Sequence, residues 1–162
     1  MIIREATDPD FPRIWPILRA TVRAGQTYAL DRDLSEQEAK TIWLTAPQRT
    51  YIVEDEGVLL GTYKLSANKA GPGNHVCNCG YIVCPEARGR GVATLMCKHS
   101  QEITVELGFR AMQFNSVVAT NKGAVRLWQS LGFDIVGTLP KAFNHPTHGF
   151  VDAYVMYKWL AD

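Results

Sequence analysis

The stretch that decides the fold reads Tyr81-Ile82-Val83-Cys84-Pro85-Glu86-Ala87-Arg88-Gly89-Arg90-Gly91-Val92-Ala93-Thr94. A β-rich apolar run passes into a basic, glycine-rich turn, and a helical pattern follows over residues 91–107. The first amides of a helix have no acceptors within the helix, and the helix dipole favours negative charge at that end. Glycines let a ligand approach the main chain, and Arg88 and Arg90 add charge-assisted donors. The stretch therefore predicts a phosphate-binding turn between a strand and a helix.

Two common nucleotide-binding motifs do not fit this turn. A dinucleotide-binding turn follows the first strand and reads G-x-G-x-x-G, whereas this turn reads Gly89-x-Gly91-x-x-Thr94 in mid-chain. The acidic residue that such a site needs about 20 positions later is missing near Ala111. The sequence also has no Walker A loop. A surface turn whose glycines only satisfy backbone geometry remains the alternative explanation for the turn by itself.

Strand and helix patterns are mixed on both sides of the turn. Ser35 and Glu38 match a capping box, and residues 55–57 match a hairpin turn. Pro16 is expected to bend the first helix or to end and restart it. Hairpins mixed with helical crossovers indicate a mixed sheet with helices against it, in an α/β or α+β fold. We predict a strand at 1–4, a helix at 11–22, a loop at 25–33, a helix from 35, strands at 51–54, 58–65 and 75–84, a helix at 91–107, a strand at 110–114, a helix at 121–131, and strands at 134–139 and 150–160.

Length and composition fit one domain covering residues 1–162. With 17 Lys and Arg against 16 Asp and Glu, any anion site must be local, and general nucleic-acid binding is disfavoured. No apolar run could span a bilayer and the first residues lack a signal-peptide pattern, so we expect a cytoplasmic protein without membrane association. The four cysteines form no C-x-x-C pair, and we expect free thiols and no metal: Cys77, Cys79, Cys84 and Cys97.

Two motifs resemble the GCN5-related N-acetyltransferase (GNAT) family. Residues 88–93, Arg-Gly-Arg-Gly-Val-Ala, match the family's Gln/Arg-x-x-Gly-x-Gly/Ala signature, and residues 83–86 resemble the strand end before it. Residues 121–133 resemble the family's Asn-x-x-Ala helix that ends in Gly-Phe. The motif order and the element order extend the resemblance over nearly the whole chain. It implies a mixed, mostly antiparallel sheet of six to seven strands, flanked by about four helices and splayed between strands 4 and 5, with acetyl-CoA in the cleft.

The resemblance also implies which residues contact acetyl-CoA. The pyrophosphate would lie on the main chain of the glycine-rich turn, and the pantetheine would pair with the backbone near Val83. Asn121 would bond the pantetheine or order the site. The expected cofactor-binding set is Val83, Arg88, Gly89, Arg90, Gly91, Val92, Ala93, Thr94, Asn121 and Ala124.

The reaction implied by the resemblance is acetyl transfer from acetyl-CoA to an amine, which needs a donor for the oxyanion and often a base and an acid. Two groups usual in the family are missing. The proton-donating Tyr is replaced by Trp128, and residues 75–79 contain no carboxylate. Amide side chains can hold a carboxylate or a carbonyl without titrating, although a structural role for them is equally open. The candidate catalytic residues are Asn78, Asn115 and Asn121, and the candidate substrate-binding residues are Thr27, Tyr28 and Asn78.

The three asparagines also resemble, more weakly, the yeast acetyltransferases that act on proline analogues such as azetidine-2-carboxylate. We therefore predict a small-molecule amine as the acceptor, with amino acids and proline analogues among the candidates. Three alternatives stay open: a non-catalytic acyl-CoA-binding or sensor domain, a protein or peptide N-acetyltransferase, and an acetyltransferase of aminoacyl-tRNA, which would need a basic path for the RNA. The last two predicted strands have edges that could pair in a homodimer.

Several aromatic and histidine side chains are assigned ordinary structural roles. We expect the histidines at 75, 145 and 148 to be solvated, because partners at metal-site spacing are missing. The predicted core anchors are Phe11, Trp15, Trp43, Tyr157 and Trp159.

Overall fold

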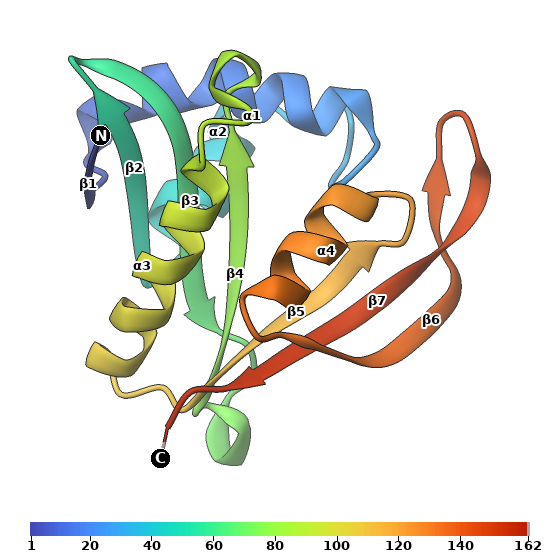
Figure 1. Cartoon of the computed structure of the whole chain (residues 1–162). Coiled ribbons are helices and arrows are strands. Elements are labelled where there is room, and N and C mark those ends of the chain that lie inside the picture. The colour runs from blue at the N-terminus through green and yellow to red at the C-terminus, as the bar shows by residue number, and fades with distance from the viewer. Residues whose placement is uncertain (162) are drawn as a thin grey trace.

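The computed structural model describes residues 1–161, and the predicted order of strands and helices is confirmed (Figure 1). Short 3-10 turns at Asp8–Asp10, Gly71–Gly73 and Pro85–Ala87 and a π-helical turn at Thr41–Thr45 connect the main elements. The main elements are β1 (Ile2–Glu5), α1 (Phe11–Ala24), α2 (Glu36–Lys40), β2 (Arg49–Asp55), β3 (Val58–Ala67), β4 (Val76–Val83), α3 (Val92–Glu106), β5 (Ala111–Val118), α4 (Lys122–Ser130), β6 (Asp134–His145) and β7 (Gly149–Trp159).

The seven strands form one sheet in the order β1-β2-β3-β4-β5-β7-β6. All neighbours are antiparallel except β4 and β5, which run parallel. The parallel pair is registered only at Val76 with Ala111 and at Cys77 with Met112, and the two strands then diverge. The expected mixed sheet, splayed between its fourth and fifth strands, is therefore confirmed.

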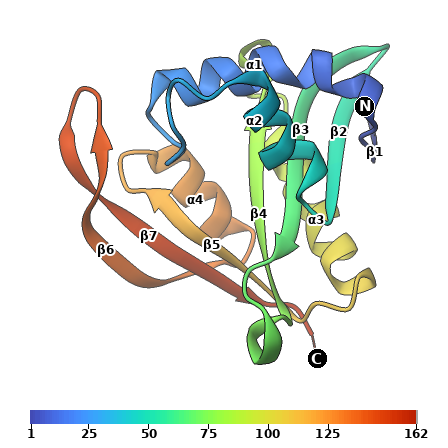
Figure 2. The same cartoon turned by 180° about the vertical axis from the view of Figure 1, so that it is seen from behind.

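The helices cover both faces of the sheet. α3 packs on β3, β4 and β5, and α4 lies beside it over β6 (Figure 1), whereas α1 and α2 cover the opposite face (Figure 2). The core under α3 and α4 is rich in aromatic and sulfur side chains, including Tyr63, Phe114 and Met96. The core under α1 and α2 is mainly aliphatic around the fully buried Trp43.

Local sequence signals explain most element boundaries. Ser35 Oγ accepts from the Glu38 amide, and the Glu38 carboxylate accepts from the Ser35 amide, so the predicted capping box starts α2. Glu56 and Gly57 both have positive φ, as a tight turn between β2 and β3 requires. The helix α1 runs unbroken through Pro16, so the expected end and restart there is wrong. Pro16 lies on the exposed side of the helix, so water can satisfy the one carbonyl that it leaves free.

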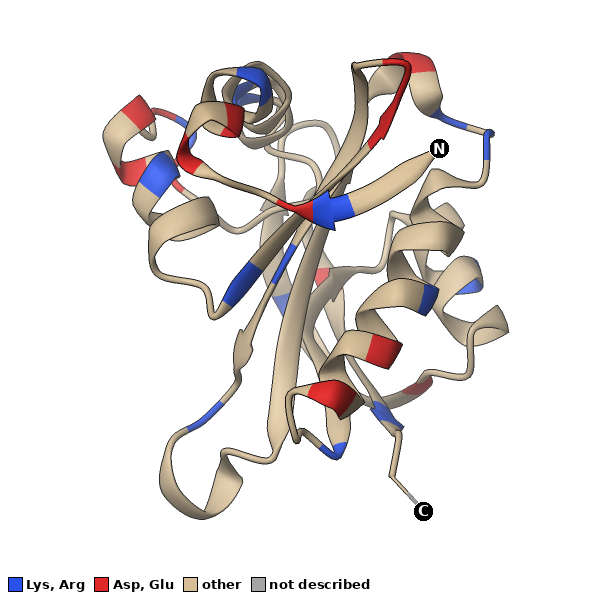
Figure 3. Cartoon of the chain, turned by 90° about the vertical axis from the view of Figure 1, so that its left-hand side faces the viewer, with Lys and Arg blue, Asp and Glu red and all other residues tan. Residues whose placement is uncertain are grey.

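A network of ion pairs ties the first strand and helix to β2. Arg4 Nη2 lies 2.7 Å from Asp10 Oδ1, and Arg4 Nε lies 2.8 Å from Glu54 Oε1. The guanidinium of Arg4 holds the pKa of the buried Asp10 well below its usual range. Basic and acidic segments are interspersed over the side of the molecule that carries the N-terminus (Figure 3).

The C-terminal hairpin differs most from expectation. β6 continues to His145 instead of ending near Leu139, because a register shift after Leu139 lets it resume pairing with β7. Lys141 takes positive φ there, and its amide donates to Asp152 Oδ1. His145 is buried rather than solvated, and its Nδ1 accepts from the amide of Thr147.

The predicted core placement of the large aromatic side chains is only partly correct. Phe11 and Trp43 are buried as expected, and Trp15 and Tyr157 are half-buried. Trp159 is 51% exposed, because the alternation along β7 directs Met156, not Trp159, into the core. β6 forms an edge of the sheet and exposes apolar side chains, and the homodimer stays a prediction. None of the helices within residues 1–161 is long and apolar enough to cross a membrane.

Candidate active site

A cavity of about 840 Å³ opens where β4 and β5 part. Its walls come from these two strands, from the N-terminal ends of α3 and α4, and from the link between α1 and α2. The structure brings most of the predicted site residues together in its lining: Thr27, Tyr28, Asn78, Val83, Arg88, Gly89, Ala93, Asn115, Asn121 and Ala124.

Four residues of the expected cofactor-binding set do not line the cavity: Arg90, Gly91, Val92 and Thr94. The Arg90 guanidinium points to the β2–β3 turn, with Nη2 3.5 Å from Asp55 Oδ2. The Val92 side chain is 1% exposed and belongs to the core. Any contact that Arg90 or Val92 makes with a ligand in the cavity would therefore use the main chain.

The glycine-rich turn has the backbone geometry that an anion site needs. Gly89 and Gly91 have φ of 76° and 78°, a left-handed conformation that other residues adopt at a cost. Gly91 is the N-cap of α3 and brings no side chain to cap it. The first amides of α3 thus keep their donors free, and the helix dipole adds to their attraction for an anion. Arg88 contributes the one guanidinium among the described residues that line the cavity.

One edge of β4 lines the gap between the strands. The Cys84 amide donates to Leu60 O on β3, so Cys84 presents its backbone groups to β3. Because alternate residues of an antiparallel strand face opposite edges, Val83 and Tyr81 direct theirs toward the gap. Val83 is therefore positioned to pair with an extended ligand lying between β4 and β5.

The start of α4 closes the gap on the β5 side. Asn121 Oδ1 accepts from the Ala124 amide at 3.3 Å and so caps the helix. Trp128, one turn further on, is 9% exposed, and its ring centroid lies 5.0 Å from that of Tyr81 and 5.2 Å from that of Phe114. The Tyr81 hydroxyl pairs with Ser100 Oγ at 2.7 Å. Residue 128 therefore supplies an apolar wall and no acidic hydroxyl.

Two asparagines, Asn78 on β4 and Asn115 on β5, line the cavity where the two strands diverge. Asn78 Nδ2 donates to Gln113 O at 2.9 Å, so its side chain spans β4 and β5 just beyond their last registered pair. Asn115 lies at the register shift of β5, where its Oδ1 accepts from Gln113 Nε2 and its Nδ2 donates to Asn68 Oδ1. Both amides are held by hydrogen bonds, and both still border the cavity.

The link between α1 and α2 covers this part of the cavity through Tyr28. Its hydroxyl donates to Tyr81 O at 2.9 Å, on the edge of β4 that faces the gap. A Cβ at Gly80 would lie 3.0 Å from that hydroxyl, so Gly80 makes room for the phenol. Burial raises the pKa of Tyr28 above its ordinary range, and the hydroxyl keeps its proton at neutral pH. Tyr28 is thus a donor and not a base.

Lys64, which borders the cavity from β3, was not among the site residues predicted from the sequence. Its Nζ lies 5.6 Å from the centroid of the Trp43 ring. The available signal was a lone cation within an otherwise uncharged run at 58–65. Ser116, beside Asn115 at the register shift, was also missed, because nothing in the sequence marks that irregularity.

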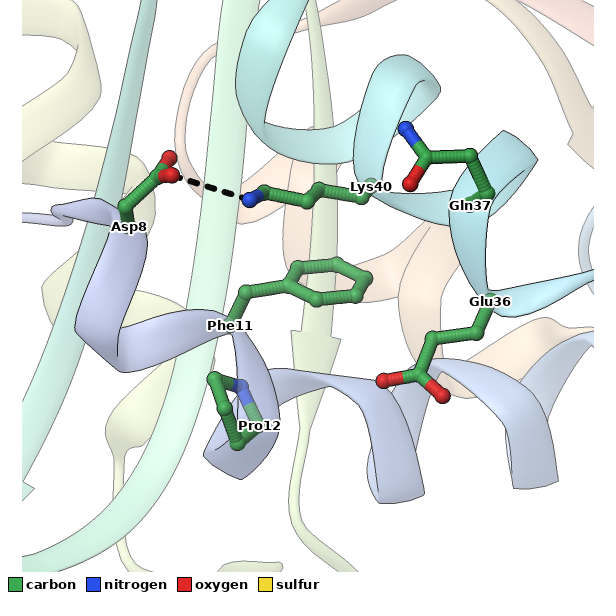
Figure 4. A pocket seen from close by; sticks show the side chains of 6 residues that line it. All are labelled: Asp8, Phe11, Pro12, Glu36, Gln37 and Lys40. Atoms are coloured by element: carbon green, nitrogen blue, oxygen red, sulfur yellow. Dashed lines mark hydrogen bonds and ion pairs between the residues drawn. The ribbon is translucent and has the colours of Figure 1, made fainter.

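A second hollow, of about 410 Å³, lies between the start of α1 and α2 (Figure 4). Lys40 Nζ binds Asp8 Oδ2 at 2.9 Å across it, above the ring of Phe11. The one cation in its lining is therefore already paired, and none of the lining residues belongs to the glycine-rich turn.

The four cysteines are free and buried, as the sequence predicts. Cys77 Sγ lies 3.3 Å from Thr104 Oγ1 in the core beneath α3. Within residues 1–161, no group of three or more His, Cys, Asp and Glu side chains is arranged to hold a metal ion.

Comparison with known proteins agrees with this geometry. A sequence model of the acetyltransferase (GNAT) family matches residues 3–133. A curated relative, "N-acetyltransferase aca1" of Schizosaccharomyces pombe, is 29% identical over 151 residues, covering 83% of this chain and 72% of the relative. The chain belongs to the GNAT family.

Solved structures place the fold in the same family. A GCN5-related N-acetyltransferase from Kribbella flavida is 45% identical, with a TM-score of 0.93 over 98% of this chain and 97% of that one. A phosphinothricin acetyltransferase from Sinorhizobium meliloti, solved with acetyl-CoA, is 24% identical with a TM-score of 0.85 over 99% and 88% of the two chains, and this likeness concerns the fold. The protein is an acetyl-CoA-dependent acyltransferase, with acetyl-CoA as its co-substrate.

Proposed function

We propose that this protein acetylates the amine of a small molecule, which binds between the α1–α2 link and the gap between β4 and β5. The observation that carries the proposal is the single cavity that joins the glycine-rich turn to Tyr28 and Asn78. A ligand held at the turn and a second ligand held beneath the link would meet where the two strands part.

The proposed acetyl-CoA end of the site uses the main chain. Free amides at the start of α3, together with Arg88, suit a doubly charged pyrophosphate. The backbone of Val83, on the open edge of β4, suits an extended pantetheine. Acetyl-CoA supplies an activated acetyl thioester to which a neutral amine adds, with loss of the CoA thiol.

The proposed acceptor end uses side chains. Tyr28 closes the cavity over β4, which favours a small acceptor over a long peptide, because a peptide needs a groove that stays open along its length. Asn78 and Asn115 offer amide groups that orient an acceptor without titrating. Asn121 fixes the first turn of α4 at the mouth of the gap.

The proposed site has no tyrosine on α4 that could give a proton to the leaving CoA thiolate. Trp128 cannot give a proton to a leaving thiolate, and the Tyr81 hydroxyl is engaged by Ser100 beneath α3. No Asp, Glu or His lines the described cavity. We therefore expect solvent to carry protons at this site and the rate to rise with the fraction of unprotonated amine.

The test is a steady-state assay of CoA release with acetyl-CoA and a panel of amines, corrected for hydrolysis. The panel spans amino acids, proline analogues, aliphatic amines, and short peptides with free N-termini. Saturable transfer to one class of small amine, with the acetylated product identified by mass spectrometry, is the expected result. Transfer to peptides alone would replace the proposal with peptide N-acetylation, and binding of acetyl-CoA without turnover on any amine would contradict it.

A further inference from the structure

The charged groups that border the cavity are all cations. Among the described lining residues these are Arg88 at the glycine-rich turn and Lys64 at the opposite end, and no Asp or Glu joins them. Arg88 is accounted for by the phosphates of acetyl-CoA in the proposed site. Lys64 is a second positive charge, in the part of the cavity that the acceptor would occupy.

Lys64 has no ionic partner within residues 1–161. It is half-buried, with its ammonium over the face of the fully buried Trp43. That ring is fixed in turn, because Trp43 Nε1 donates to Thr62 Oγ1 at 3.1 Å. Burial lowers the pKa of Lys64, which reflects the cost of holding a cation there without a counterion. An anionic ligand would remove that cost.

We propose that Lys64 binds a carboxylate of the acceptor, so that the preferred substrates are amines that carry a carboxylate close to the amine, as amino acids do. The inference rests on the proposed function, because it describes the acceptor of the same site. It makes Lys64 a residue that determines specificity, acting on the substrate and not on acetyl-CoA.

The positions on the sheet set the size of this acceptor. Lys64 lies directly opposite Gly80 on β4, about 4.8 Å across the strand pair. Asn78 lies two residues from Gly80 on the same face, next to the gap where β4 leaves β5. Lys64 and the gap therefore flank the same stretch of β4, which suits an acceptor that carries its carboxylate close to its amine, as an amino acid does.

The surroundings of Lys64 add an apolar wall for the acceptor. The rings of Tyr28 and Trp43 meet edge to face, with centroids 5.9 Å apart. Gly80 contributes no side chain, and the Tyr28 hydroxyl and the Trp43 ring occupy the place that its Cβ would take, so both aromatic side chains lie close to the strand beside Lys64. A compact hydrocarbon body, such as a small ring or a short aliphatic side chain, fits against these aromatic surfaces. A second positive charge on the acceptor would be repelled by Lys64.

The test compares matched acceptors in the wild type, Lys64→Met and Lys64→Arg. Each acceptor set contains an amino acid, its carboxamide, and the amine that lacks the carboxylate altogether. Differences in amine basicity cancel when the acid-to-carboxamide ratio of kcat/KM is compared between enzymes. Lys64→Met keeps the length of the stem over Trp43, and Lys64→Arg keeps the charge. Thermal unfolding checks that both variants fold.

We expect the wild type to prefer the acid over its carboxamide about tenfold or more. In Lys64→Met, the preference for the acid should disappear because KM for the acid rises. Lys64→Arg should keep part of the preference. KM for acetyl-CoA should be the same in all three enzymes. A ratio unchanged in Lys64→Met would overturn the inference. So would a wild type that acetylates acid, carboxamide and simple amine equally, which would leave the proposed function intact. No transfer to any amine would contradict both proposals.

Discussion

The two ends of the cavity are built in different ways. At the glycine-rich end, one continuous segment provides the site through its main chain, with Gly89 and Gly91 in a left-handed conformation and α3 starting at once. At the other end, single side chains come from the α1–α2 link, β3, β4 and β5, with Tyr28, Lys64 and Asn78 among them. A site built from the main chain suits the CoA moiety, which is the same for every acceptor. A site built from side chains can gain a different acceptor specificity when one of those residues is substituted.

This difference predicts that substitutions at the two ends affect different substrates. Changes at the glycine-rich turn should weaken acetyl-CoA binding whatever the acceptor. Changes at the opposite end should alter KM for the acceptor and leave the affinity for acetyl-CoA unchanged.

The largest effect is expected for Gly91→Glu. The new carboxylate would stand at the free amides of α3, where a like charge beside pyrophosphate costs several kcal/mol. We expect the Kd for acetyl-CoA to rise about a hundredfold or more, as measured by calorimetry. Gly91→Ala is the matched control, because it imposes the same backbone strain, about 1 kcal/mol, without the charge. Equal affinity in the Glu and Ala variants would remove the turn from the proposed site.

The second-largest effect is expected for Asn121→Ala, at the boundary between the two ends of the cavity. Loss of the bond from the Ala124 amide removes the N-cap of α4, which costs about 1 kcal/mol of stability and loosens the mouth of the gap. We expect kcat to fall about tenfold. Asn121→Ser keeps a capping oxygen and should retain the stability. If Asn121→Ser also restores kcat, Asn121 acts by capping; if kcat stays low, the amide itself takes part.

Asn78→Ala tests the acceptor end. The variant removes the side chain that spans β4 and β5 and leaves Gln113 O without its donor. We expect KM for the acceptor to rise about tenfold, with an unchanged Kd for acetyl-CoA. Asn74→Ala, at an exposed asparagine outside the cavity, is the control and should change neither constant. A loss of acetyl-CoA affinity alone in Asn78→Ala would show that the residue serves the other substrate.

The smallest effect is expected for Tyr28→Phe. The variant keeps the ring against Trp43 and removes only the hydrogen bond to Tyr81 O, a change of about 1 kcal/mol. KM for the acceptor should therefore rise about fivefold. Burial keeps this phenol protonated at a pH where a free tyrosine ionises, about 10. The pH profile should accordingly be the same for the wild type and Tyr28→Phe, and a basic limb lost only in the variant would assign Tyr28 a titrating role.

The same contrast explains what the sequence could predict. The turn at 88–94 and the helix cap at Asn121 are local, because their conformations depend on residues that are neighbours in the chain. The divergence of β4 and β5 was predicted from the family resemblance. Lys64 was not predicted as a site residue, because its position in the cavity depends on Trp43 and Gly80, which come close to it only in the folded protein.

Long-range packing also accounts for the errors in the fold. His145 was misplaced because β6 resumes its pairing with β7 after a register shift, and Trp159 because the alternation along β7 directs Met156 into the core instead. At that shift of β6, Lys141 has positive φ and its amide donates to Asp152 Oδ1, a contact that no local sequence pattern indicates.

A crystal structure of the protein with CoA and an unreactive analogue of the best acceptor would test both ends of the cavity at once. We expect the pyrophosphate on the amides at the start of α3, the thiol in the gap between β4 and β5, and the acceptor beneath Tyr28. CoA bound away from the glycine-rich turn, or an acceptor bound outside the cavity, would contradict the proposed site.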